Sequence, residues 1–475
     1  MMANISSKAE TTISWLGEAA EESDDAVELI RKLGDWTRDH QGEIFDGEGD
    51  EPPGDGSIQT TTDAIEWLGL PLRKQNWPAV WRFLERPYWA RVWIIQELAV
   101  RGRLAKASGI LYCGTKQAER AQFDYFCGLM LVIIMSRKTV RADTHELDEP
   151  LKSMIIGGHP QGLTMAQTLG ALTGDENNNL DWLLRVTARS KATDPRDKLY
   201  ALLGLAGDGD LPTPDYTMGY EQMLKNFVSS HIKRYNSLTA VLGNRYIEMP
   251  SGPSWVPDLL HDNFHGGRGL IPAADNNCFR AAGSRTAIIS INGALDTLSA
   301  RGVSVGEIDK VIGPLIVAEK LSDPTQSIQS VSMSLGQDTF LEALRDFGKG
   351  LPESSREAFW RTFRPDFALK QQVAFGLDSI PADFMPREPE SARYVAFVRP
   401  FTASLQAALS NRTFIATKDG RMGVGPYLAQ AGDIVVVMFG APFCLLLRPV
   451  GHEYRLVGDA YVHGIMPGEL VKGLG

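Results

Sequence analysis

Cysteine and histidine are scarce in this chain of 475 residues. The four cysteines, Cys113, Cys127, Cys278 and Cys444, lie far apart and form no CxxC pair, so they lack the spacing of a structural zinc site. We expect them to be reduced thiols in a cytoplasmic protein. The eight histidines form no HExxH motif, so the sequence predicts neither a zinc hydrolase nor another metal site.

Long apolar runs and positive charge are also lacking. The longest apolar runs, at 129–135 and 434–439, fall well short of the roughly 20 residues that a membrane-spanning helix needs, and the first ten residues contain no signal-peptide core. The formal net charge is −10, and no basic patch interrupts it. Long-range repulsion therefore argues against nucleic acid and acidic membrane surfaces as partners.

What the chain does have is the composition of an ordinary folded protein, with 43% hydrophobic and 22% charged residues. It is too long for a single core, since cores stop growing at roughly 250–300 residues. The patterns predict a mixed α+β protein in three parts. These are a partial α/β domain over 1–110, a mainly helical region over 111–270, and a β-rich region over 271–475 with a helical insertion at about 338–411.

The first part opens with TTISWLG at 11–17, which has the pattern of a buried strand ending at a glycine. An amphipathic helix should follow over 21–33, with Ser23 or Asp24 as its N-cap. Residues 39–60 are acidic and rich in glycine and proline, so they cannot bury enough apolar surface to offset the entropy of ordering. We predict a mobile loop there.

The last 65 residues show short apolar runs separated by glycine turns, which is typical of a small barrel or a sandwich. The stretch GRMGVGP at 420–426 superficially resembles a phosphate-binding loop. No helix follows it, however, so a hairpin turn explains it better.

The run ERPYWARVWIIQEL at 85–98 places one carboxylate, Glu97, among large apolar side chains. A helical wheel from Tyr88 to Arg101 puts an apolar stripe on one side and groups Trp89, Trp93, Gln96 and Glu97 on the other. Two interpretations remain open. Glu97 either pairs with Arg101 or another arginine to fix helix packing, or it serves as the polar group of a ligand pocket lined by Trp89, Trp93 and Gln96.

A second motif, ATDPRDKLYALLGLA at 192–206, has the features of a helix start. Asp194 can act as the cap, a proline occupies the first turn, and Asp197 lies near the third position. We expect a structural role for Asp194, Arg196 and Asp197, as for Arg86 and Arg91 in the earlier run.

Several long motifs occur in an order that closely resembles the fungal heterokaryon-incompatibility (HET) domain proteins. They are SWLGEA (14–19), RPYWARVWIIQELAV (86–100), TDPRDKLYALLGLA (193–206), PDYT (214–217), PSWVPD (253–258), GVGPYLAQAGDIVVVMFGAPFCLLLRP (423–449) and YRLVGDAYVHGIMPGE (454–469). The resemblance covers nearly the whole chain. Members of this family normally carry a further segment ahead of the WLGE strand, so it implies an N-terminally incomplete HET domain with an exposed sheet edge.

The resemblance implies a fold similar to the TIR domain of immune receptors and a part in non-self recognition and programmed cell death. In enzymatic TIR domains, a glutamate in a Trp-x-x-x-Glu helix serves NAD cleavage, and Trp93 to Glu97 has this spacing. By resemblance, Glu97 is the candidate catalytic residue and NAD is a substrate, with no cofactor. Two alternatives accompany the incompatibility role: a TIR-like NAD glycohydrolase, or an inactive regulatory chain that binds other HET proteins through its sheet edge.

Overall fold

We analysed a computed structural model of the chain, which divides into two compact units, Met1–Pro214 with Glu319–Val331, and Asp215–Ala318 with Ser332–Gly475. Each unit is described by itself. The structure describes residues 5, 8–41, 75–102, 108–135, 160–173, 179–188, 190–209, 211–242, 252–257, 259, 279–313, 343–344, 346–362 and 412–472. Most of the predicted acidic loop at 39–60 and most of the predicted helical insertion at 338–411 lie outside these residues.

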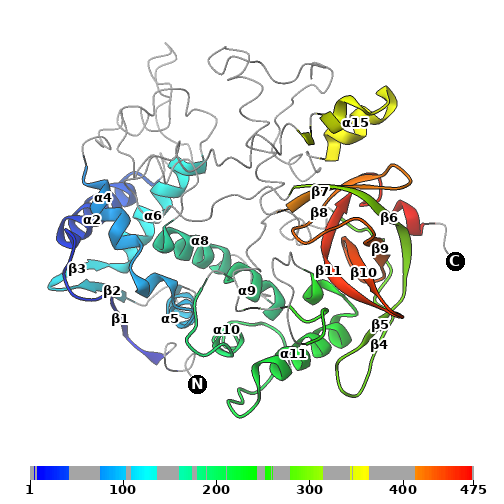
Figure 1. Cartoon of the computed structure of the whole chain (residues 1–475). Helices are drawn as coiled ribbons and strands as arrows, with labels where there is room; N and C mark the ends of the chain where they lie inside the picture. Colours follow the sequence, from blue (N-terminus) through cyan, green and yellow to red (C-terminus); the bar gives the residue numbers. More distant parts are fainter. Residues whose placement is uncertain are drawn as a thin grey trace. The chain divides into compact units, whose positions relative to one another are not determined.

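The first unit is built on a small mixed sheet (Figure 1). Its strands are β1 (Thr11–Trp15), β2 (Ser108–Cys113) and β3 (Lys116–Glu119), in that spatial order. β1 runs parallel to β2, and β3 returns antiparallel to β2 through a two-residue turn. Among the described strands, β1 and β3 therefore form the two edges of the sheet.

Two helices, α2 (Ser23–Asp39) and α6 (Arg120–Met135), pack together beside this sheet. They approach closely at Gly34, where an added Cβ atom would lie 2.1 Å from the Gln122 carbonyl oxygen. The prediction that Ser23 or Asp24 caps α2 is wrong, because the N-cap is Glu22 in a left-handed conformation and makes no side-chain cap hydrogen bond. Ser23 is instead the first helical residue, and its Oγ accepts a hydrogen bond from the Ala20 amide.

β1 is not the buried strand that its sequence predicts. Ser14 is 4% exposed, whereas Ile13 and Trp15 on the opposite side of the strand are 67% and 50% exposed. Their β2 partners are Ile110 and Tyr112, so these apolar side chains share one open face of the sheet. An apolar run identifies a strand, but it does not reveal whether the second face is covered.

The predicted continuous helix from Tyr88 to Arg101 is wrong as well. The chain forms α4 (Trp77–Leu84), a 3-10 turn η2 (Pro87–Ala90) and then α5 (Trp93–Gly102). Between them Arg91 is extended and forms a parallel bridge with Lys191. The amide of Val92 donates to the Lys191 carbonyl at 2.9 Å, a tertiary contact that a helical wheel cannot include.

Three more helices complete the described part of this unit: α8 (Gln161–Thr173), α9 (Leu180–Val186) and the short α10 (Asp197–Tyr200). α8 packs on α4, η2, α5 and α6. Asn179 caps α9 by accepting from the Trp182 amide at 2.8 Å. These helices therefore belong with the sheet, although the sequence assigns them to a separate helical region over 111–270.

The second unit begins with α11 (Tyr220–Tyr235) and the 3-10 turn η4 (Thr239–Val241). A two-stranded sheet of β4 (Ile289–Ile291) and β5 (Leu298–Ala300) follows, and α15 (Glu353–Thr362) lies farther along the chain. The Leu238 amide donates to the Gly440 carbonyl at 2.9 Å, which ties the turn after α11 to the C-terminal strands. A last 3-10 turn, η9, spans Glu469–Val471.

The C-terminal strands form a closed six-stranded barrel in the order β10-β11-β8-β7-β6-β9 (Figure 1). Five of them occupy the last 65 residues: β7 (Arg412–Thr417), β8 (Met422–Pro426), β9 (Ile434–Met438), β10 (Cys444–Val450) and β11 (Glu453–Val462). The prediction of a small β module is confirmed. GRMGVGP covers the last two residues of the β7–β8 turn, Gly420 and Arg421, and the whole of strand β8. At Gly423 an added Cβ would lie 2.2 Å from the Tyr461 carbonyl oxygen, so this glycine permits the close approach of β8 and β11.

The sixth barrel strand, β6 (Gly302–Ile312), comes from much earlier in the chain. It pairs with β7 on one side and β9 on the other, with a register shift in each pairing. Because β6 connects these two strands, the barrel closes without an open edge. The sequence prediction does not include this closing strand.

Candidate functional site

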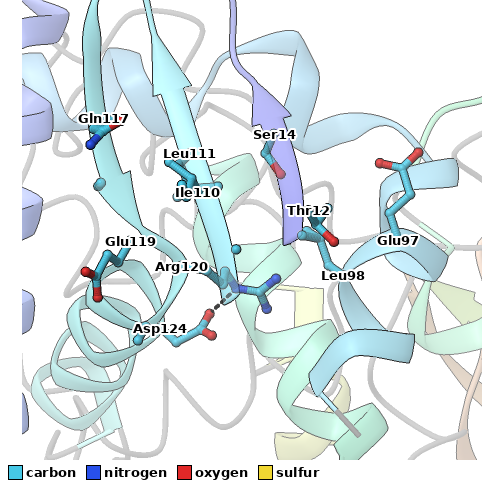
Figure 2. Close-up of a pocket in the computed structure, with 13 residues that line it drawn as sticks. Thr12, Ser14, Glu97, Leu98, Ile110, Leu111, Gln117, Glu119, Arg120 and Asp124 are labelled. Carbon is cyan, nitrogen blue, oxygen red and sulfur yellow. Dashed lines mark hydrogen bonds and ion pairs between the residues drawn. The ribbon is translucent and has the colours of Figure 1, made fainter. Parts of the chain in front are cut away.

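A pocket of about 420 Å³ opens in the first unit between the sheet, α5 and α6 (Figure 2). Pockets of this size are typical of small-molecule sites. Figure 2 shows Thr12 and Ser14 on β1, between Glu97 of α5 and the residues of β2. The lining residues are Thr12, Ser14, Glu97, Leu98, Gly109, Ile110, Leu111, Gln117, Ala118, Glu119, Arg120, Ala121 and Asp124.

Glu97 lies in the wall of this pocket and is partly buried by α5. Burial raises the pKa of its carboxyl, and the positive charge of Arg91 only partly opposes the rise. No ion pair joins Glu97 to a residue whose side chain the structure describes, and the side chain of Arg101 lies outside that part. The carboxylate is therefore held in surroundings that disfavour its charge, as is common for functional groups in pockets.

Trp89, Trp93 and Gln96, which the helical wheel groups with Glu97, each contact different parts of the first unit. Trp89 is fully buried, stacks on Phe123 at 4.5 Å between ring centroids, and donates from Nε1 to the Phe83 carbonyl. Trp93 Nε1 donates to the Asp197 carboxylate at 3.0 Å. The break in the helix at Arg91 separates Trp89 from α5, so the wheel does not describe their arrangement. The role of these residues in ligand binding stays a prediction.

Gln96 is buried at the position before Glu97, and its Oε1 atom has no hydrogen-bond partner among the residues that the structure describes. A buried amide oxygen without a partner carries a desolvation cost of roughly 1–3 kcal/mol. This cost falls beside a carboxylate whose pKa is raised by burial, so two neighbouring polar groups of α5 are in surroundings that do not favour stability.

The motif around Asp194 surrounds the start of α5. Asp194 accepts from the amide and the guanidinium of Arg196, which lowers the pKa of its carboxyl. Asp197 holds Trp93, the first residue of α5. Farther along, Arg86 donates to the carbonyls of Leu16 and Glu18, just past the end of β1. These contacts position the strand and the helix that carry the two walls of the pocket.

Two polar pairs at the pocket have no counterpart in the sequence interpretation. The Tyr88 hydroxyl lies 2.8 Å from Ser14 Oγ, and Arg120 Nε donates to the Asp124 carboxylate at 2.6 Å. The sequence could have predicted the second pair, because an arginine and an aspartate four positions apart at the start of a helix commonly form an ion pair. The first pair has no local signal, because its members are 74 residues apart.

No group of histidines, cysteines and carboxylates within the described residues is arranged to bind a metal. His261 and His265, which are four positions apart, lie outside that part. Likewise, no helix among the described residues is long and apolar enough to cross a membrane.

Comparison with known proteins identifies both ends of the chain. Residues 1–97 match the family described as "Heterokaryon incompatibility protein (HET)". This end of the chain is therefore similar to a HET domain. Residues 395–473 match the Het-6 beta-barrel domain, which includes the five barrel strands β7 to β11. The predicted family resemblance is confirmed at both ends.

One curated relative of the chain is "Heterokaryon incompatibility protein 6, OR allele" from Neurospora crassa. It is 25% identical over 549 aligned positions, which cover 99% of this chain and 78% of the relative. No solved structure matches the chain. The HET match ends at Glu97, so the pocket combines residues within the matched segment with β2, β3 and α6 beyond it.

Proposed function

We propose that this chain acts in heterokaryon incompatibility, as a trigger of cell death after fusion of genetically different fungal cells. The observation that carries the proposal is the presence of a HET domain at one end and a Het-6 barrel at the other. The alignment with an incompatibility protein over 99% of the chain adds support, because the region between the two domains is also related.

The test is expression of the full chain in a filamentous fungus that lacks it. Hyphae of this strain are fused with a panel of wild isolates, and dead fusion cells are counted with a vital dye. We expect death with some isolates and survival with the parental strain. Survival of all fusion cells, at a protein level verified by immunoblot, would overturn the proposal.

A second candidate is cleavage of NAD at the pocket, with Glu97 as the catalytic residue. It is supported by the position of Glu97 in the pocket and by the raised pKa of its carboxyl. In this reaction the bond between ribose and nicotinamide breaks, and its electron pair leaves with nicotinamide. The Glu97 carboxylate would hold the ribose hydroxyls and stabilise the positive charge of the sugar until water adds and loses a proton.

Nicotinamide release from NAD by the purified chain tests this activity. We expect Glu97→Gln to lower the rate at least about a hundredfold, the size of effect seen when one transition-state contact is lost. Glu119→Gln is the matched control, because Glu119 also lines the pocket but is exposed. No release of nicotinamide by the wild type would exclude the glycohydrolase. Equal rates for the wild type and Glu97→Gln would exclude Glu97 as the catalytic residue.

A further inference from the structure

Two arginine side chains in the second unit lie over the same aromatic ring. The guanidinium carbon of Arg285 lies 5.0 Å from the ring centroid of Phe439, and that of Arg301 lies 6.0 Å from it. Phe439 is buried, whereas Arg285 is partly buried and Arg301 is exposed. Since both guanidinium groups contact one ring, two positive charges are held close to each other where solvent can reach them.

Backbone hydrogen bonds fix the two arginines beside the end of β9. The Phe439 amide donates to the Arg301 carbonyl at 3.0 Å, and the next amide, that of Gly440, donates to the Arg285 carbonyl at 2.9 Å. The Arg301 amide in turn donates to the Ile288 carbonyl at 2.9 Å, next to the pairing of β4 with β5. The barrel strand therefore sets the positions of both arginines.

No carboxylate from the surrounding segments offsets these charges. Backbone hydrogen bonds bring together the segments 230–242, 279–295, 297–306 and 434–452, and none of them contains an aspartate or a glutamate. Asp296, in the turn between β4 and β5, is already paired with Lys225 at 2.6 Å. Within the described part of the chain, the contact with Phe439 is the only interaction that either guanidinium makes.

This arrangement favours an anion. An aromatic ring attracts each guanidinium, but the two positive charges repel each other. Each guanidinium also presents five N–H donors in a planar fork that matches the oxygens of a phosphate group. A phosphate group carries a charge of about −1.5 to −2 at pH 7, so it would offset both arginines and accept hydrogen bonds from both.

We infer that Arg285 and Arg301 form a binding site for a phosphate group, with the Phe439 ring holding the two guanidinium groups in place. The ligand is inorganic phosphate or a small phosphate monoester, because both present the same oxygens to the two forks. The site belongs to the second unit and is independent of the pocket in the first unit and of the proposed cleavage of NAD.

Calorimetric titration of the full chain at constant ionic strength tests the ligand class. The probes are inorganic phosphate and glycerol 3-phosphate, and acetate serves as an anion with a single charge. We expect saturable binding of the phosphate probes and at least about tenfold weaker binding of acetate, because acetate offsets only one arginine. Tighter binding of glycerol 3-phosphate would identify an ester as the ligand, and tighter binding of inorganic phosphate would identify the free ion. No binding of either phosphate probe, or equal binding of acetate, would overturn the inference.

Variants test the two arginines. Arg285→Gln and Arg301→Gln should each weaken phosphate binding at least about tenfold, the value of one hydrogen bond to a charged group. Arg285→Lys keeps the charge but loses the planar fork, so its affinity should lie between those of the wild type and Arg285→Gln. Lys310→Gln is the matched control, because Lys310 also lies over an aromatic ring, that of Phe347 at 5.5 Å, near the far end of β6. Equal weakening by Lys310→Gln would indicate a general effect of charge and contradict a site at Arg285 and Arg301.

Melting curves separate a binding site from a purely structural stack of arginines on the ring. A ligand that binds the folded chain raises its melting temperature. Phosphate should therefore raise the melting temperature of the wild type and of Lys310→Gln, and it should have little effect on Arg285→Gln or Arg301→Gln at the same ionic strength. An equal shift in all four proteins would show that the two arginines have only a structural role.

Discussion

At the scale of single residues, Glu97 is the clearest departure from what stability alone would favour. It is partly buried, and burial raises the pKa of its carboxyl more than the positive charge of Arg91 lowers it. The sequence left both interpretations open. The structure places Glu97 in the wall of a pocket. The side chain of Arg101 lies outside the described residues, so an ion pair between Arg101 and Glu97 stays a prediction, as does the ligand role of Glu97.

Glu97→Gln should therefore stabilise the protein at neutral pH. A carboxyl whose folded pKa is raised above its unfolded value destabilises the folded state once it is ionised, and the penalty disappears as the pH falls below the unfolded pKa. We expect the melting temperature of Glu97→Gln to exceed that of the wild type by a few degrees at pH 7 and to equal it near pH 3.5. A lower melting temperature at pH 7 would instead indicate a lost ion pair.

At the scale of elements, the barrel contains a buried ion pair that replaces part of a strand ladder. Extending the register of β8 and β11 by two residues places Pro426 opposite Asp459, and proline has no amide proton to donate. Arg412 of the neighbouring strand supplies the bond instead, donating to the Asp459 carbonyl at 3.0 Å and to its carboxylate at 2.7 Å. Both side chains are at most 1% exposed, so each needs the other.

Removal of one partner should be far more damaging than removal of both. Arg412→Met leaves the Asp459 charge buried alone and should lower the free energy of unfolding by about 3–5 kcal/mol in urea titrations. The double variant with Asp459→Leu should recover much of this loss. Arg421→Met is the control, because its pair with Asp419 is exposed and contributes at most about 1 kcal/mol. Equal losses for Arg412→Met and Arg421→Met would contradict this account.

At the scale of the whole molecule, the exposed strand β1 is the surface through which we predict that the chain binds other HET proteins. Ile13 and Trp15 stand exposed on an edge strand, the kind of element that pairs with a further chain. Binding through this edge stays a prediction, with a second copy of the chain as the simplest partner.

Sedimentation at increasing concentration tests that surface. We expect Ile13→Lys to weaken self-association at least about tenfold, since a charged edge opposes strand pairing. Tyr454→Lys is the control. Tyr454 is also an exposed apolar residue, at 60%, but it belongs to barrel strand β11 and not to the sheet that contains β1. A wild type that remains monomeric at every concentration would exclude self-pairing of β1.

The sequence by itself determined most of the local elements and the family resemblance. Short apolar runs and glycine turns predicted the five C-terminal strands as a small barrel or a sandwich, and helix periodicity predicted α2. The ordered motifs predicted the resemblance to HET-domain proteins, which the family match confirms. These features depend on neighbouring residues, so they can be read along the chain. The position of Glu97 at a pocket agrees with one of the two predicted interpretations, although its ligand role stays a prediction.

Only the tertiary structure decided how distant segments combine. The hydrogen bond between Trp93 and Asp197 joins residues 104 positions apart, and the one between Tyr88 and Ser14 joins residues 74 positions apart. Strand β6 ends at Ile312 but pairs in the barrel with β7, which begins only at Arg412. The helical break at Arg91 has the same origin, since its bridge to Lys191 replaces a helical contact. The free energy of such pairings comes from surfaces that meet after folding, so no local pattern contains it.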